Sequence, residues 1–351
     1  IYRANACIEG CTKSTQLVES LKKRLIAEAK FFRAYSYFYL LNIYADVPLI
    51  TGTDFKVNES KPRVPITEVY NQIIKDLSEA EADLQLSNES SERVRVDKAV
   101  VQAFLARVYL YTKNWSDAEI AANNIIDNPN YVLETDLDQA FASSGREAIF
   151  RLMPANPGFE TPEGFLFVPS NSSTIPKYYI SESLLSSFSA EDKRREHWLN
   201  KNTVNGTDYY YPYKYKTRRQ SQPSSDFTER YNVLRLAETY LIRAEARAQQ
   251  DKVDDGLEDL NRIRGRAGLQ DTTLSGKDEL LAAIFNERRL ELFAEGAHRW
   301  LDMKRTDRID AIMPAVAVIK GTTWSPEDKL WPIPFYQIQS NPALTQNPGY
   351  Q

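Results

Sequence analysis

The chain has 351 residues, of which 42% are hydrophobic and 26% are charged, and its formal net charge at pH 7 is −4. This length and composition are those of a globular protein that buries a sizeable core, in one large domain or two. The mild acidity leaves no basic footprint, which argues against nucleic acid as the main partner. No apolar run approaches the roughly 18 residues of a membrane-spanning helix.

The chain contains only two cysteines, Cys7 and Cys11, four positions apart in a stretch expected to be helical. We expect two small, buried or half-buried thiols, because a disulfide at this spacing within a helix is geometrically awkward. A zinc site would need further ligands, and the two histidines, His197 and His298, lie far apart in the sequence. The sequence therefore predicts neither a metal centre nor a cofactor.

The first part of the chain is predicted to be helical. Between Arg24 and Ala45, apolar residues recur at the three- and four-residue spacing of a buried helix face: these are Phe31, Ala34, Phe38 and Leu41. Thr67 and Asp97 are expected to cap the next two helices, because their side chains can accept from the first free backbone N–H groups. A fourth helix is expected from about Ser116 to Asp127.

Two pairs of small residues suggest repeated helical hairpins. Ala106 and Ala118 are twelve residues apart, and so are Ala244 and Gly256. In each pair, a small residue on one helix is expected to meet the other across a short turn. Tetratricopeptide repeats, ~34-residue helical hairpins that stack into a solenoid, require this packing. The sequence therefore predicts a mainly helical fold with repeats at about 16–127 and 232–305.

A further helix is expected after a capping box formed by Ser275 and Asp278. Beyond it, the stretch from Glu287 to Asp302 carries acidic and basic residues at spacings of three and four. On a helix this pattern favours ion pairs over a catalytic pair of carboxylates. No Gly-rich phosphate loop occurs, and neither histidine has a recognisable nucleophile beside it. We therefore expect a protein that is not an enzyme.

The segment between Met153 and Tyr231 differs from the rest of the chain. Helical periodicity fails there, seven prolines divide it into loops, and aromatic residues concentrate in it. A long segment without regular structure is usually functional or disordered, and this many aromatic side chains argue against disorder. Loops on a rigid frame commonly carry binding residues. We expect this loop-rich, aromatic-rich insert, at about 153–231, to face the ligand.

The last stretch, from Leu330 to Tyr350, contains four prolines and no charged residue. Each proline removes a backbone donor and pushes the preceding residue towards extended geometry. The sequence therefore predicts an extended C-terminal tail at 330–351 that packs on the body of the protein and contains no helix.

Five blocks resemble, in the same order, the motifs of the SusD/RagB family of outer-membrane nutrient-binding proteins. They are "EAKFFRAYSYFYLLNIYADVPLI", "RVDKAVVQAFLARVYLYTKNWSDAEIAANNII", "LRLAETYLIRAEARAQQDKVDDGLEDLNRIRGRAGL", "ERRLELFAEGAHRWLDMKR" and "LWPIPFYQIQSNPALTQNPGY". The family has Gly where Ala45 stands. The chain also opens at "IYRANACIEGC", inside what resembles a helix of the family.

The resemblance implies a SusD-like α-α superhelix as a single domain over 1–351. It also implies non-catalytic binding of oligosaccharides and their delivery to a SusC-like TonB-dependent transporter. Family members are lipoproteins on the outer face of a Bacteroidetes-type outer membrane, anchored through an N-terminal cysteine. A preceding segment with that lipid anchor is therefore expected outside this chain. Cys7 is not that cysteine, because no apolar segment precedes it.

Sugar recognition needs rings and hydrogen-bonding groups together. A pyranose packs a face of C–H groups on an aromatic ring, and its hydroxyls need polar partners. The expected stacking residues are Tyr178, Tyr179, Trp198, Tyr211 and Trp324, and Asn171 and Arg218 are the expected hydrogen-bonding residues. These assignments rest on composition and not on a family motif. For the tyrosines from Tyr209 to Tyr215, one face of a β-hairpin strand is the alternative role.

Two other functions remain open at this point. A family member that takes up peptides would bind through a groove lined by charges instead of aromatic rings, since helical repeats hold peptides elsewhere. A glycosidase would release products from a polysaccharide, although no sequence motif recommends a pair of carboxylates.

Overall fold

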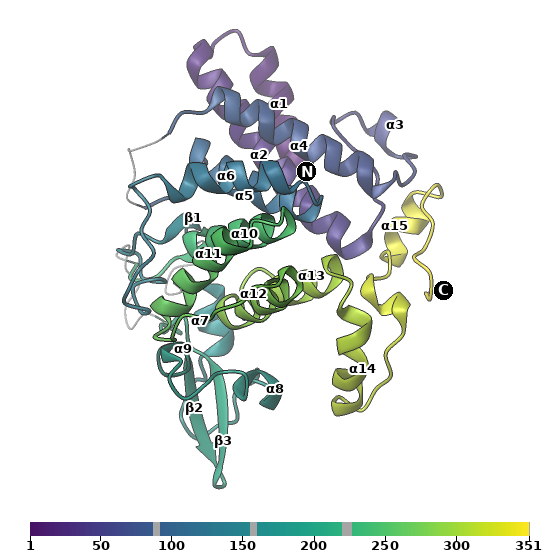
Figure 1. Cartoon of the computed structure of the whole chain (residues 1–351). Helices are drawn as coiled ribbons and strands as arrows, with labels where there is room; N and C mark the ends of the chain where they lie inside the picture. Colours follow the sequence, from purple (N-terminus) through teal and green to yellow (C-terminus); the bar gives the residue numbers. More distant parts are fainter. Residues whose placement is uncertain (87–91, 155–159, 220–226, 351) are drawn as a thin grey trace. The chain divides into compact units, whose positions relative to one another are not determined.

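The computed structural model describes residues 1–86, 92–154, 160–219 and 227–350. The protein is mainly helical (Figure 1). It divides into two compact units. The first unit comprises Ile1–Leu86, Val96–Val101 and Arg299–Gln351, and the second comprises Ser87–Arg95 and Gln102–His298. The single domain expected over 1–351 stays a prediction.

The helices and strands follow one another as labelled in Figure 1. In the first half of the chain they are α1 (Tyr2–Lys13), α2 (Glu19–Tyr44), α3 (Phe55–Asn58), α4 (Ile66–Asp83), α5 (Lys98–Tyr111), α6 (Trp115–Ile126), β1 (Ala148–Leu152) and α7 (Pro162–Phe167). They continue with α8 (Glu182–Leu185), α9 (Lys193–His197), β2 (Leu199–Val204), β3 (Thr207–Pro212), β4 (Tyr231–Arg235), α10 (Leu236–Gln249) and α11 (Val253–Arg266). The last are α12 (Lys277–Glu291), α13 (His298–Arg305), α14 (Ile309–Ile319), the 3₁₀ helix η1 (Pro326–Lys329) and α15 (Phe335–Ser340).

The first unit is built on the packing of α2 against α4. The predicted apolar stripe of α2 is confirmed, since Phe31, Phe38 and Leu41 are buried, and Val69 and Ile73 on α4 are buried as well. Burying side chains of this size is the main favourable term in folding. On α1, the Cys7 and Cys11 thiols are free, with their sulfur atoms 3.9 Å apart.

The C-terminal tail packs on the body of the first unit, as expected. Arg63 donates to the side chain of Asn347 at 2.5 Å, and Trp331 donates its backbone N–H to the carbonyl of Ile43 at 3.0 Å. The prediction of a tail without helix is wrong, because Phe335–Ser340 forms α15. Proline is tolerated at the start of a helix, and Pro334 is the N-cap of α15. The next proline comes only after α15 has ended.

Two expected helix caps are also wrong. The helix near Thr67 begins at Ile66, and the side chain of Asp46 accepts the Ile66 N–H at 3.0 Å. The N-cap of α12 is Gly276, and no side chain caps it. The cap at Asp97 is confirmed, since its carboxylate accepts from the N–H of Val100 at 3.0 Å.

In the second unit, α10 packs against α6, α11 and α12. The predicted contact between Ala244 and Gly256 is present in this frame. A Cβ added at Gly256 would lie 2.9 Å from the carbonyl oxygen of Ala244, so only glycine fits this crossing without a shift. The other predicted pair, Ala106 and Ala118, is fully buried.

The second unit also contains two small antiparallel sheets, β1 with β4 and β2 with β3. The expected hairpin is confirmed: β2 and β3 pair along their length, from Leu199 opposite Pro212 to Val204 opposite Thr207. Short helices α8 and α9 lie near the base of this hairpin (Figure 1). The insert is therefore a hairpin with short helices and loops, carried by the helices of its unit.

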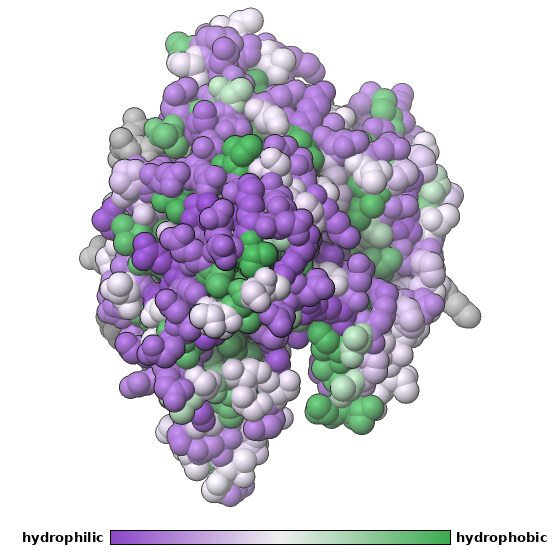
Figure 2. Space-filling view, in the orientation of Figure 1, coloured by the Kyte–Doolittle hydropathy of each residue, from purple (hydrophilic) through white to green (hydrophobic). Residues whose placement is uncertain are grey.

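No helix among the described residues combines the length and the apolar character needed to cross a membrane. Most of the surface shown in Figure 2 is hydrophilic, and an apolar area covers α14. Val318 and Ile319, at the end of that helix, are 76% and 82% exposed.

Candidate functional site

The insert presents a group of aromatic rings, which we call the insert surface and define as Phe167, Tyr178, Tyr179 and Tyr209. Tyr178 is 44% and Tyr179 is 57% exposed. The ring of Phe167 meets that of Tyr178 edge to face, at 6.1 Å between centroids, and Tyr179 meets Tyr209 in the same way at 5.5 Å. Each exposed tyrosine is thus held by a second ring, which is the arrangement a rigid stacking platform needs.

The loop that carries the two tyrosines is fixed to the β2–β3 hairpin by hydrogen bonds. The buried side chain of Asn202 donates to the carbonyls of Asn171 and Thr174 at 2.9 and 2.7 Å. Just after the tyrosines, Ile180 donates its N–H to the carbonyl of Tyr210 at 2.6 Å. Asn202 was not among the predicted site residues, because it stands among other polar residues and no sequence motif marks it.

The two predicted hydrogen-bonding residues lie in this region. The exposed Asn171 accepts the N–H of Ser173 at 3.0 Å, which closes a turn. Arg218 donates to the carbonyls of Phe165 and Val168 at 2.5 and 2.9 Å, and its guanidinium lies 4.4 Å from the centroid of the Phe165 ring. Arg218 therefore supports α7 through one guanidinium nitrogen, which donates to both carbonyls.

Trp198 and Tyr211 are buried, at 0% and 5% exposure, so this structure gives neither a surface on which a sugar could stack. The indole N–H of Trp198 donates to the carbonyl of Leu137 at 3.0 Å, and its ring meets Phe141 edge to face. The ammonium of Lys214 lies 4.6 Å from the ring centroid. Trp198 is thus a core residue in this arrangement.

Trp324 belongs to the other unit. Its indole N–H donates to Asp310 at 3.1 Å, and its ring meets that of Trp300 edge to face at 6.0 Å. The structure therefore gives Trp324 its own local environment and does not assign it to the insert surface.

A buried charge cluster joins the insert to the helices of its unit. It is formed by Glu147, Arg194, Lys214, Arg235, Arg266, Glu287, Glu291 and Glu295. Arg235 bonds to Glu147 at 2.8 Å and to Glu291 at 2.5 Å, and Lys214 bonds to Glu295 at 2.5 Å. The predicted ion pairing of the acidic block is therefore present. The partners of Glu287, Glu291 and Glu295 are distant in the sequence. Asp302, in contrast, pairs with Arg305 three residues further along α13, at 2.8 Å.

The cluster compensates its own charges. Burial alone raises the pKa of Glu291, but Arg266, Arg235 and Arg194 outweigh it and hold that pKa well below the usual value. Burial lowers the pKa of Lys214 to about 8, and the carboxylate of Glu295 opposes this shift. These carboxylates are buried and already bonded to cations. The cluster therefore has the character of structural support and lacks the exposed acid and nucleophile that a glycosidase site needs.

One group of residues in the described part of the chain has the spacing of a cation site: Asp136, Asp138 and His197. The ammonium of Lys216 lies 2.7 Å from a carboxylate oxygen of Asp138 and neutralises it. Burial opposes the resulting shift, but Lys216 and His197 lower the pKa of Asp138. A cation would have to compete with this ammonium, so the donor set fits a metal poorly.

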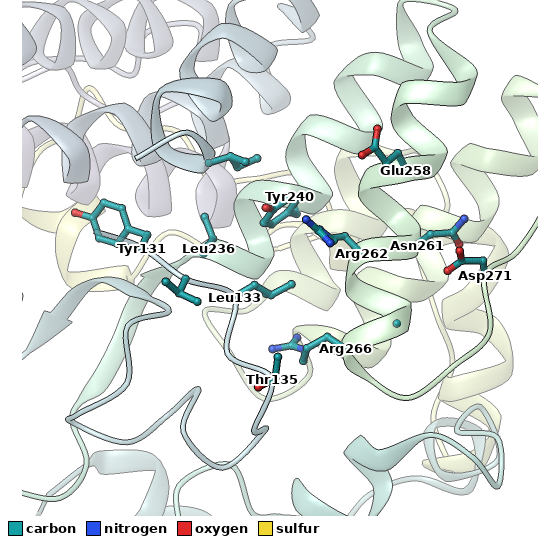
Figure 3. Close-up of a pocket in the computed structure, with 13 residues that line it drawn as sticks. Tyr131, Leu133, Thr135, Leu236, Tyr240, Glu258, Asn261, Arg262, Arg266 and Asp271 are labelled. Atoms are coloured by element: carbon teal, nitrogen blue, oxygen red, sulfur yellow. The ribbon is translucent and has the colours of Figure 1, made fainter. Parts of the chain in front are cut away.

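A separate hollow lies in the helical frame of the second unit, and we call it the α11 pocket. It has a volume of about 700 Å³ and lies between α11, the first turns of α10 and the segment from Tyr131 to Thr135. Figure 3 shows Tyr131, Leu133 and Leu236 opposite the side chains of α11, with Arg262 beside Tyr240. No residue lining it was predicted as a site residue.

Two family models match the chain. One, described as the SusD family, matches residues 189–350, and the other, described as starch-binding associating with outer membrane, matches residues 1–110. Among curated relatives, a SusD-like protein of Formosa agariphila is 26% identical over an alignment of 410 residues. The alignment covers 100% of this chain and 78% of the relative.

Solved structures agree with this assignment. A SusD superfamily protein from Parabacteroides distasonis is 26% identical, with a TM-score of 0.82 over 99% of this chain and 83% of its own. A laminarin-binding SusD-like protein is 25% identical, with a TM-score of 0.78 over 100% of this chain and 84% of its own. The helical fold is that of these proteins, and the chain belongs to the SusD/RagB family.

Proposed function

We propose that the protein binds oligosaccharides or polysaccharides at the cell surface and delivers them to a SusC-like TonB-dependent transporter of the outer membrane. It would do so without cleaving them. The observation that carries this proposal is the insert surface, where Tyr178 and Tyr179 are exposed and each is held by a second ring. The laminarin-binding relative, similar over the whole chain, supports the choice of sugar as the ligand.

The insert surface suits a sugar better than a charged peptide. Its exposed rings offer faces for the C–H groups of a pyranose, and few rotatable bonds have to be frozen when they bind. Lys177 lies near Tyr178, 5.3 Å from the ring centroid, and can add a hydrogen bond to a hydroxyl. A surface of rings flanked by few charges is the arrangement we expected for a glycan-binding member of the family.

The absence of catalysis is part of the proposal and has its own support. Glu287, Glu291 and Glu295 bond to buried cations, so these carboxylates are not placed to protonate a glycosidic oxygen or to attack a sugar. Location at the outer membrane is supported by the description of the family model that matches residues 1–110. A lipid anchor on the outer face of that membrane is part of the proposal.

The test is isothermal titration of the protein against a panel of plant, host and fungal oligosaccharides that includes laminari-oligosaccharides. Chromatography of each mixture after long incubation checks for products. Saturable binding of one sugar class with no product supports the proposal. Binding of peptides from a parallel panel, with no sugar bound, would replace it by the peptide-uptake alternative, and release of shorter sugars would overturn the non-catalytic role.

A further inference from the structure

We propose that the α11 pocket is a second saccharide-binding site, selective for a neutral sugar unit over an acidic one. The inference rests on the proposed function and assigns it a further site, apart from the insert surface in composition and in position along the chain. The pocket volume of about 700 Å³ falls within the roughly 300–1,000 Å³ typical of small-molecule sites.

Two tyrosine side chains that line the pocket each have an arginine close to the ring. The guanidinium of Arg93 lies 4.7 Å from the centroid of the Tyr131 ring, and that of Arg243 lies 5.5 Å from the centroid of the Tyr240 ring. Each cation lies beside its ring and restrains it on the wall of the pocket. Apolar side chains between the rings, such as Leu133 and Leu236, suit the C–H face of a pyranose.

The pocket also supplies unpaired hydrogen-bonding groups of both kinds. The side chains of Arg262, Glu258 and Asp271 line it and form no hydrogen bond or ion pair with any residue that the structure describes. Arg262 offers donors, and the two carboxylates offer acceptors. A polyhydroxylated ligand uses both, because each hydroxyl donates one hydrogen bond and accepts others.

Arg266 provides an independent sign of a ligand. It is only 9% exposed, and two of its nitrogens bond to Glu147 and Glu291 at 2.9 and 2.5 Å. Its Nε is buried and has no hydrogen-bond partner among the described residues, although the side chain lines the pocket. Figure 3 places this guanidinium beside Thr135. A buried donor left unpaired is costly, and a shift of this side chain towards the pocket would let a ligand oxygen pair with it and remove the cost.

Gly265 is the glycine of α11 that lines the pocket. It lies in the last helical turn, its φ is not positive, and a Cβ added there would meet nothing within 4 Å. Neither backbone strain nor close packing therefore accounts for glycine at this position, in contrast to Gly256 on the same helix. The missing side chain lets a ligand approach the helix backbone.

The charges of the pocket set its selectivity. Glu258 and Asp271 oppose the single unpaired guanidinium of Arg262, while the charge of Arg266 is already compensated by Glu147 and Glu291. The unpaired groups thus leave a net negative charge facing the ligand. A uronate or sulfate group would be repelled, whereas hydroxyl groups accept from Arg262 and donate to the carboxylates.

The test uses Gly265→Leu, which fills the pocket with a good helix former and leaves the fold intact. Gly10→Leu on α1, another helical glycine whose Cβ would meet nothing within 4 Å, is the matched control. Laminarihexaose is the neutral probe, and a hexamer of galacturonate is the acidic probe. Affinity is measured by titration calorimetry, and hydrogen exchange reports protection of residues 131–135 and of α11.

We expect laminarihexaose to protect both segments in the unsubstituted protein. Gly265→Leu should abolish that protection and reduce the affinity of the α11 pocket at least tenfold, while binding at the insert surface remains. Gly10→Leu should change neither. Galacturonate should bind the pocket at least tenfold more weakly than laminarihexaose. If the Gly265→Leu variant kept full protection of both segments and full affinity for laminarihexaose, the assignment of the α11 pocket as a sugar site would be overturned. Sugar binding elsewhere on the protein would still support the proposed function. Tighter binding of galacturonate would overturn the selectivity, and a peptide that alone protects these segments would overturn the sugar assignment. Failure of every sugar to bind the unsubstituted protein would overturn the proposed function itself.

Discussion

Arg107 on α5 and Glu238 on α10 form a buried, two-pronged ion pair. The guanidinium donates from Nε and from one Nη to the two carboxylate oxygens, at 2.7 and 2.5 Å. Both side chains are almost entirely buried. Burial alone raises the pKa of Glu238, but the Arg107 charge outweighs it, with a contribution from His298, and lowers the pKa to about 2.

This pair predicts a loss of stability in acid. A carboxyl with a lowered pKa stabilises the fold above its unfolded pKa, and that contribution disappears as the pH falls towards its folded pKa. For Glu238 the window runs from 4.5 down to about 2. Since a tenfold change in proton affinity is worth ~1.4 kcal/mol, the pair contributes on the order of 3 kcal/mol at neutral pH. Urea unfolding followed from pH 6 to pH 2 measures it.

The variant Glu238→Gln isolates this contribution. It should be less stable than the parent at pH 6, by about 3–5 kcal/mol, because Arg107 is left buried without its counter-charge. The difference should shrink as the pH approaches 2. Asp208→Asn, which removes an exposed partner of Lys201, is the control and should leave the pH profile almost unchanged. A constant difference between Glu238→Gln and the parent at all pH values would contradict the lowered pKa.

Trp198 is predicted to be a stability residue and not a binding residue. Replacing it with Ala should cost about 3–5 kcal/mol of unfolding free energy, because its ring is fully buried and its N–H bonds to Leu137. Thermal unfolding measures the loss, and Trp198→Phe should retain part of the stability. Weaker sugar binding by a Trp198→Ala variant of unchanged thermal stability would return this residue to the list of stacking candidates.

The two glycines of α11 should respond oppositely to Ala. At Gly256 the added Cβ meets the carbonyl oxygen of Ala244 at 2.9 Å, and we expect a loss of about 1–3 kcal/mol. At Gly265 the Cβ has open space, and we expect a gain of up to about 1 kcal/mol from the better helix propensity of Ala. Chemical denaturation of both variants gives the comparison. Equal effects would mean that the crossing of α10 and α11 is not as tight as the structure indicates.

The spacing of Ala244 and Gly256 could be interpreted from the sequence because small residues at a helix crossing leave a regular pattern. The same is true of the apolar stripe on α2. The partners of Glu291 could not be predicted, since Arg235 and Arg266 reach it through tertiary packing that no local spacing encodes. The cap of α4 could not be predicted for the same reason. Asp46, which accepts the N–H of Ile66, lies twenty residues earlier in the chain and reaches the helix through tertiary packing.

The candidate site was predicted only in part. Composition indicated the insert, and Tyr178 and Tyr179 are exposed there. The period-two alternation of a strand predicted that Tyr209 and Tyr211 share one face. Burial of the side chains also varies along the length of the strand, which alternation does not predict. Tyr209 lies nearer the tip of the hairpin, while Tyr211 lies near its base and is buried. The α11 pocket was not predicted, because its lining comes from three separate segments.

Tyr179 is expected to contribute directly to sugar binding at the insert surface. Removing its ring with Tyr179→Ala should lower affinity about threefold to tenfold, from the ~0.5–1.5 kcal/mol that an aromatic contact provides. Unfolding stability should change little, since Tyr179 is 57% exposed. Tyr336→Ala on α15, a tyrosine that is 78% exposed, is the matched control and should bind normally. Calorimetry with the best ligand of the panel makes the comparison, and equal affinity in both variants would remove Tyr179 from the insert surface's binding role.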